Sequence, residues 1–240
     1  MMKVIQPNCR VQFTADDIEF ILGVLRPGVD NAECLTRLLA DEETRDLVLD
    51  DEKLFHAVLE QRHCLRISTH FYFYILVRQV FRRSGIEERA VADYVAEVMA
   101  EFSRAENLRC RVQGQPKDYF VDMLAALQTA DDLTSFYIRA HIGNYSLFLS
   151  GIFPDHVRFR AERRGAPGLN YYEGLGQANY RAASDHRLAR KYALDGIFNI
   201  LADRFQTTRL ALNDLGERLL NLHEVDASIK ALLHSTFKPG

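Results

Sequence analysis

The chain has 240 residues and a mass of 27.6 kDa, which is enough for one substantial domain with its own core. Hydrophobic residues make up 48% and charged residues 26%, so the disordered and fibrous classes are excluded. The net charge is −3 and the pI about 6.2, so no strong overall field favours nucleic acid or acidic membranes. Because Gly and Pro number only 13 and 6, we predict an all-α fold of about ten helices, forming a single domain over residues 1–240.

The first third of the chain predicts an extended arm followed by short helices. Thr14 has the character of an N-cap, and acidic residues follow it in the first turn, where they suit the helix dipole. Ser68 has the same character before a strongly apolar segment that Gly85 ends. The predicted elements are an arm over 1–13, helices over 14–25 and 30–40, helical segments within 41–64 broken near Asp50, and helices over 69–83 and 87–104.

The remainder also predicts helices, with one irregular stretch over residues 105–115 that contains a short strand at 109–112. Pro116 is typical of a first helical residue, as is Pro154, and Gly165 is typical of a helix end. We expect N-caps at Asn170, Asp185 and Thr208. The predicted helices cover 116–130, 132–150, 154–164, 170–184, 185–205, 208–222 and 225–236, followed by a flexible tail over 237–240.

Polar and aromatic side chains concentrate between residues 136 and 191, on otherwise apolar helices. Buried polar groups need hydrogen-bonding partners, so this set either fixes the packing or lines a cavity, and the sequence leaves both interpretations open. A spacing of four in Gly174, Ala178 and Ala182 predicts close approach of a helix near Gly143, or of a flat ligand. The candidate ligand-binding residues are Arg139, His141, Asn144, Tyr145, Tyr172, Tyr180 and His186.

The sequence assigns no catalytic residue. Asp185 next to His186 is typical of a helix cap beside a surface histidine, or of an acid–base histidine, and no nucleophile motif accompanies the pair. A di-iron bundle needs two ExxH pairs, and the chain has only the one from Glu60 to His63. His56, His63 and His70 would lie about 10 Å apart along a helix, too far for one ion. We expect no metal site and no cofactor, and keep a metal- or haem-dependent enzyme as an alternative.

Charge is distributed unevenly along the chain. Residues 1–60 carry 6 basic and 13 acidic residues, and residues 156–191 carry 8 basic and 3 acidic residues. Arginine pairs well with phosphate and carboxylate groups, so the basic block is the candidate anion-binding segment. A solvated face, or an interface with the acidic first sixty residues, is the simpler explanation of this block. The candidate anion-binding residues are Arg158, Arg160, Arg163 and Arg164.

The four cysteines form no CxxC pair, which excludes a zinc knuckle or a disulfide framework. No apolar segment follows a basic start, and the longest apolar stretch, residues 71–77, is far below the roughly 20 residues of a membrane span. We therefore expect a soluble protein of the cytoplasm that makes no membrane contact.

Two segments carry a resemblance to a known group of proteins. They are the sequence LFLSGIFP over residues 147–154 and the sequence YYEGLG over residues 171–176, followed by Tyr180. Over residues 135–190 the chain resembles a family of uncharacterised bacterial helical proteins. The resemblance implies a bacterial source and no particular activity.

The sequence favours a binding or interaction module for a small anionic ligand or a protein partner, which includes a second copy of the chain. The alternatives are an enzyme with a helical-bundle pocket, and salt-sensitive phosphate or nucleic-acid binding through residues 158–191. No recognition helix with base-reading residues is evident, so specific DNA binding is not expected.

Overall fold

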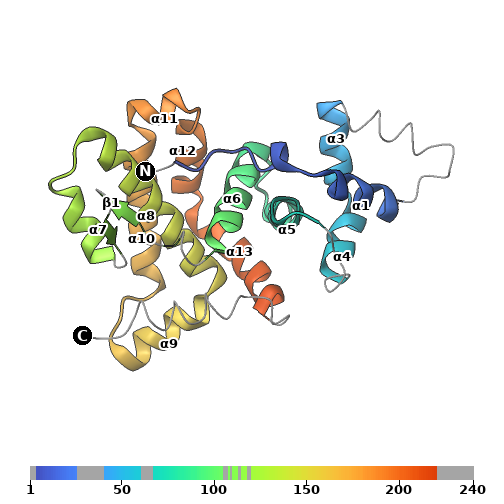
Figure 1. Cartoon of the computed structure of the whole chain (residues 1–240). Helices are drawn as coiled ribbons and strands as arrows, with labels where there is room; N and C mark the ends of the chain where they lie inside the picture. Colours follow the sequence, from blue (N-terminus) through green and yellow to red (C-terminus); the bar gives the residue numbers. More distant parts are fainter. Residues whose placement is uncertain are drawn as a thin grey trace. The chain divides into compact units, whose positions relative to one another are not determined.

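The computed structural model describes residues 4–25, 41–60, 67–104, 108, 110–112, 115–117 and 120–220 (Figure 1). The all-α fold predicted from the sequence is confirmed, with twelve α-helices in the described residues. The chain divides into two compact units. The N-terminal unit is Pro7–Glu97, the C-terminal unit is Met1–Gln6 with Val98–Gly240, and each is described by itself. The single domain stays a prediction.

The N-terminal unit is built around α5, which the sequence predicts correctly. Ser68 caps this helix, its hydroxyl accepting a hydrogen bond from the Phe71 N–H at 3.1 Å. Most of the helix is buried, as its nearly continuous apolar sequence requires. Thr14 and Asp17 cap α1 reciprocally, and the predicted break near Asp50 is confirmed. The elements are the 3-10 turn η1 (Arg10–Gln12), α1 (Ala15–Leu25), α3 (Glu42–Leu49), α4 (Glu52–Glu60), α5 (Thr69–Arg83) and α6 (Arg89–Phe102), whose last turn belongs to the C-terminal unit.

The C-terminal unit is built around α8, a long helix that packs against α10 and α13 (Figure 1). Almost every residue of α8 from Phe136 to Ile152 is buried or partly buried. Gly165 ends α9 in the left-handed conformation with φ 60°, as the sequence predicts. The elements are β1 (Cys110–Val112), β2 (Gln115–Lys117), α7 (Phe120–Leu127), α8 (Asp132–Ile152), α9 (Pro154–Arg164), α10 (Leu169–Ser184), α11 (Arg187–Lys191), α12 (Asp195–Asp203) and α13 (Phe205–Leu220).

Pro116 corrects one prediction. The residue does not open a helix but lies in β2, which pairs antiparallel with β1 in the register Cys110↔Lys117. A two-stranded hairpin leaves outward N–H groups unpaired, so a proline without an N–H is tolerated there. The strand predicted over 109–112 is confirmed for its described part, Cys110–Val112, and the following helix begins at Phe120.

Three predicted caps are also wrong. Gly168 takes the N-cap position of α10, so Asn170 lies within the first turn. His186, not Asp185, caps α11, and the single helix predicted over 185–205 is two helices, α11 and α12, because Ala193 between them has a φ of 53°. Thr208 lies inside α13, where its hydroxyl donates to the Arg204 carbonyl at 2.9 Å.

Several predictions concern residues outside the described ones. They are the helix over 30–40, the last helix over 225–236 and the tail over 237–240. Among the described helices, none combines the length and apolar character that a membrane span needs.

Candidate functional site

The space between α8 and α10, where the sequence predicts a ligand or close packing, is filled by protein side chains. The Tyr180 ring lies against Gly143, and a Cβ at this glycine would stand 2.8 Å from the ring. The fully buried Tyr180 hydroxyl donates to Asn144 Oδ1 at 2.7 Å. Tyr180 and Asn144 therefore form a hydrogen bond with each other between the two helices. Because Gly143 has no side chain, there is room for the tyrosine ring.

Gly176 makes the equivalent approach to α13. A Cβ at Gly176 would stand 2.3 Å from the Phe205 ring and 3.1 Å from Ser146 Cβ. The predicted small-residue stripe points elsewhere, since Gly174 meets open space and Ala178 is exposed. The close approach is thus real, but Gly176 makes it rather than Gly174.

His141 and Tyr145 form a second set of contacts on α8, with aromatic neighbours. The His141 ring lies 5.5 Å from the Phe102 ring, and its Nε2 lies 3.2 Å from the Leu108 carbonyl oxygen. That carbonyl can only accept a hydrogen bond, so Nε2 carries the proton. Burial lowers the pKa of His141 to about 4, and the ring is therefore neutral at pH 7. Tyr145 stacks on Phe120 at 5.0 Å.

Tyr172 and Arg139 complete the predicted cluster but make different contacts. The Tyr172 ring packs edge-on against Phe120 at 5.4 Å, and burial raises its pKa. Arg139 is only partly buried on α8. Tyr172 and Tyr145 therefore share the Phe120 ring, whereas Tyr180 and Asn144 form a separate pair.

His186 lies at the start of α8 rather than with the other candidates. Its Nδ1 accepts the Leu188 N–H at 3.1 Å, its Nε2 lies 2.9 Å from Asp132 Oδ1, and its ring stacks on Phe136 at 5.0 Å. Arg187 also pairs with Asp132, at 3.1 Å. Both ring nitrogens face groups of the protein itself, which is the arrangement of a helix cap.

The basic segment predicted to bind anions forms helix α9. Arg158, Arg163 and Arg164 are exposed, and Arg158 pairs with Asp155 at 2.8 Å. Arg160 differs, since it is only partly exposed and close enough to Tyr172 to affect its pKa. Phe159, between these arginines, is 54% exposed. An exposed aromatic ring in a helix with several exposed arginines is therefore the distinctive feature of α9.

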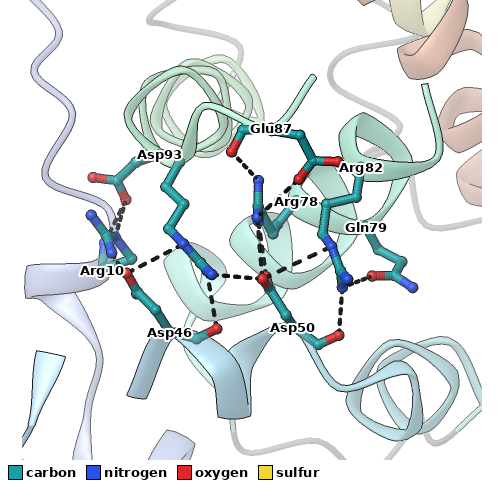
Figure 2. Close-up of polar contacts among 9 residues, drawn as sticks. Arg10, Asp46, Asp50, Arg78, Gln79, Arg82, Glu87 and Asp93 are labelled. Atoms are coloured by element: carbon teal, nitrogen blue, oxygen red, sulfur yellow. Dashed lines mark hydrogen bonds and ion pairs between the residues drawn. The ribbon is translucent and has the colours of Figure 1, made fainter. Parts of the chain in front are cut away.

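The largest polar cluster of the described residues lies in the N-terminal unit, and sequence reasoning missed it (Figure 2). Asp50, at the end of α3, accepts two hydrogen bonds from Arg78 of α5, at 2.8 and 3.1 Å. Arg89 of α6 also contacts Asp50, at 2.9 Å, and Arg82 donates to the Asp50 carbonyl at 2.8 Å. Burial alone would raise the pKa of Asp50, but the arginines outweigh it and hold the pKa below its usual value.

The same cluster holds the segment around η1. The Arg10 side chain donates to Asp46 at 2.6 Å, and its backbone N–H donates to Asp93 at 2.9 Å (Figure 2). Burial raises the pKa of Asp93. The Arg10 guanidinium also lies 5.8 Å from the Tyr74 ring, and the buried Tyr74 hydroxyl has no hydrogen-bond partner among the described residues. The one signal in the sequence was Arg78, a charged residue inside an apolar helix.

The described part of the chain contains no cluster of side chains arranged for metal binding or for thiol chemistry. No group of three or more His, Cys, Asp or Glu side chains in that part is placed to hold a metal ion. His56 and His70 lie on separate helices, and His63 falls outside the described residues. Cys9 and Cys110 are free and buried, and burial raises the pKa of both thiols.

No protein-family model matches the chain, and no curated protein or solved structure matches it significantly. The resemblance to a bacterial helical family therefore stays a prediction.

Proposed function

We propose that the chain is a protein-interaction module and that the exposed face of α9 is its binding surface. Pro154 and Val157 are buried and anchor this helix. Phe159 and Arg163 lie four residues apart on another face and are exposed, as are Arg158 and Arg164. Its partner is a protein segment in which carboxylates surround an apolar side chain.

The exposed Phe159 is the observation that carries the proposal. The arginines alone have a simpler explanation, because cations in the last turn stabilise a helix through its dipole and Arg158 already pairs with Asp155. Neither effect explains a phenylalanine that is 54% exposed. Aromatic residues and arginine dominate the energetic centres of protein interfaces, and arginine binds carboxylates with two parallel hydrogen bonds.

A small-ligand site between α8 and α10 has weaker support, because Tyr180 and Phe205 occupy the space beside the two glycines. Phosphate or nucleic-acid binding through the arginines is the second candidate, and it gives Phe159 no role. The free buried thiols of Cys9 and Cys110 support a location in the reducing cytoplasm.

Fluorescence anisotropy with a labelled peptide of glutamates around one leucine tests the proposal. We expect Phe159→Ala and Arg163→Glu each to weaken binding of this peptide by about tenfold. Arg190→Glu makes the same charge change at another exposed arginine of this unit and serves as the matched control. Replacing the peptide's leucine by glycine should remove the effect of Phe159→Ala.

Absence of binding, or an equal loss in the Arg190→Glu variant, contradicts the proposal. Inorganic polyphosphate identifies the second candidate. If polyphosphate binds, its affinity falls steeply with salt and Phe159→Ala has no effect, then α9 is an anion-binding helix without a protein partner.

A further inference from the structure

We propose that the partner of α9 is helix α3 of a second copy of this chain, an inference that rests on the function proposed for α9. Helix α3 presents the complementary chemistry. Glu43 and Leu47 lie four residues apart on its outer face, where Leu47 is 69% exposed, and Glu42 is exposed in its first turn. Acidic residues in the first turn suit the helix dipole, but that effect does not explain an exposed leucine.

The inner face of α3 is already occupied, so only the outer face remains for a partner. Leu49 is buried, Asp46 pairs with Arg10, and Asp50 at the end of the helix pairs with Arg78. These contacts fix the orientation of the helix within the N-terminal unit. Leu47 and the two glutamates are therefore presented on a firmly held element.

The spacing of the two faces matches in an antiparallel arrangement. Glu43 precedes Leu47 by four residues and Arg163 follows Phe159 by four, so each pair shares one helix face. With Leu47 opposite Phe159 and the helices antiparallel, Glu43 lies opposite Arg163.

The helix dipoles favour the antiparallel arrangement over the parallel one. With the same apolar contact and parallel helices, Glu43 would meet Asp155, a like charge. The antiparallel arrangement brings the N-terminus of α3 to the C-terminus of α9, which opposes the two helix dipoles favourably. The antiparallel arrangement also places Asp51 near Asp155. The charge of Asp155 is offset by its ion pair with Arg158, at 2.8 Å.

This contact is small and joins two different surfaces. Two short helices bury less than a standard interface of about 1,600 Å², so one contact is weak and reversible. Because every copy carries both faces, two copies can form the contact twice and close a dimer, or the contact can repeat in an open chain. Concentration-dependent association is expected in either case.

Sedimentation velocity of the full chain, from about 1 to about 300 µM, tests the inference. We expect reversible association that weakens with added salt. Leu47→Ala and Phe159→Ala, and the charge reversals Glu43→Arg and Arg163→Glu, should each weaken it by about fivefold or more. Glu19→Arg, at an exposed acid of α1, is the matched control and should leave it unchanged.

The double variant Glu43→Arg/Arg163→Glu gives the decisive result, because it restores the opposite charges between copies and should recover association. Circular dichroism verifies that each variant is folded, and Leu47→Ala tests the contact without a charge change. A monomer at every concentration, or no recovery in the double variant, overturns the inference. If the acidic peptide still binds α9 in a Phe159-dependent way, the function proposed for α9 survives that result.

Discussion

Two buried tyrosines differ in the hydrogen bonding of their hydroxyl groups. Tyr180 donates to Asn144 at 2.7 Å, whereas the Tyr74 hydroxyl has no hydrogen-bond partner in the part of the chain that the structure describes. A hydrogen bond between buried groups contributes about 1 kcal/mol, and an unsatisfied group costs a similar amount. We predict that Tyr180→Phe lowers the free energy of unfolding by about 1–2 kcal/mol, while Tyr74→Phe leaves it unchanged or raises it. Urea denaturation measures both, and equal losses would show that the Tyr74 hydroxyl is paired.

His141 makes stability depend on pH between about 6.5 and 4. Its pKa is about 4 in the folded chain and 6.5 in an unfolded one, so the unfolded state binds more protons in this range. Stability is fully present above pH 6.5 and falls as the pH is lowered. From pH 7 to 5 this amounts to about 2 kcal/mol.

We predict that His141→Gln removes this loss, because its amide can donate to the Leu108 carbonyl and does not titrate. Urea denaturation at pH 7 and pH 5 measures the difference for both proteins. All other titrating groups are shared by the two proteins, so their contributions cancel in the comparison. An equal pH dependence in both proteins would contradict the prediction.

The sequence predicted that these polar residues need partners, but not which ones. His141 finds a backbone carbonyl, and Tyr180 finds Asn144, a residue 36 positions away. Both results follow from the angle and register at which helices pack, which local spacing does not determine. The sequence therefore identified the network-forming residues and could not distinguish a cavity from a packed interface.

At the scale of elements, two glycines of α10 have opposite roles. Gly176 faces Phe205, and its Cβ would lie 2.3 Å from that ring, whereas Gly174 faces open space. We predict that Gly176→Ala lowers the free energy of unfolding by about 1–3 kcal/mol through overpacking. Gly174→Ala, the matched control, should raise it by about 0.5–1 kcal/mol through helix propensity. Thermal or urea denaturation checks both signs, and a stabilising Gly176→Ala would mean that α10 and α13 are not in contact there.

The ends of helices and strands were predictable where the role of the residue at the boundary depends only on its local sequence. Ser68 and Gly165 behave as the sequence predicts, because capping and left-handed geometry depend on local chemistry. Pro116 and Thr208 do not, since proline also fits an unpaired strand edge and threonine also bonds the carbonyl four residues before it. The ambiguous residues are those whose role depends on tertiary neighbours.

At the scale of the whole molecule, the sum of charges conceals the ion pairs that hold the N-terminal unit. Residues 1–60 have an excess of acid, yet Asp46 and Asp50 are matched by arginines from other segments. These arginines lie 28 to 43 positions from the two aspartates, so no local pattern reveals them. The net charge of whole segments therefore predicted candidate surfaces but not the buried cluster of ion pairs.

Asp50 is the residue of this cluster whose replacement we expect to lower the free energy of unfolding most. Arg78, only 3% exposed, would remain buried without its carboxylate in an Asp50→Ala variant. Removing one partner of a buried ion pair typically costs about 3–5 kcal/mol, so we predict a loss of this size at pH 7. Because the pKa of Asp50 is below its usual value, the wild-type advantage is present above pH 4 and declines as the pH falls through that lowered pKa.

Denaturation of the wild type and the Asp50→Ala variant at pH 7 and about pH 3 measures this convergence. The double variant Asp50→Leu/Arg78→Met provides the control, since replacing a buried pair by apolar side chains of similar volume is often neutral. It should recover part of the lost stability, with the rest owed to Arg82 and Arg89, which also contact Asp50. A double variant no more stable than Asp50→Ala would show that the carboxylate acts mainly through those two arginines.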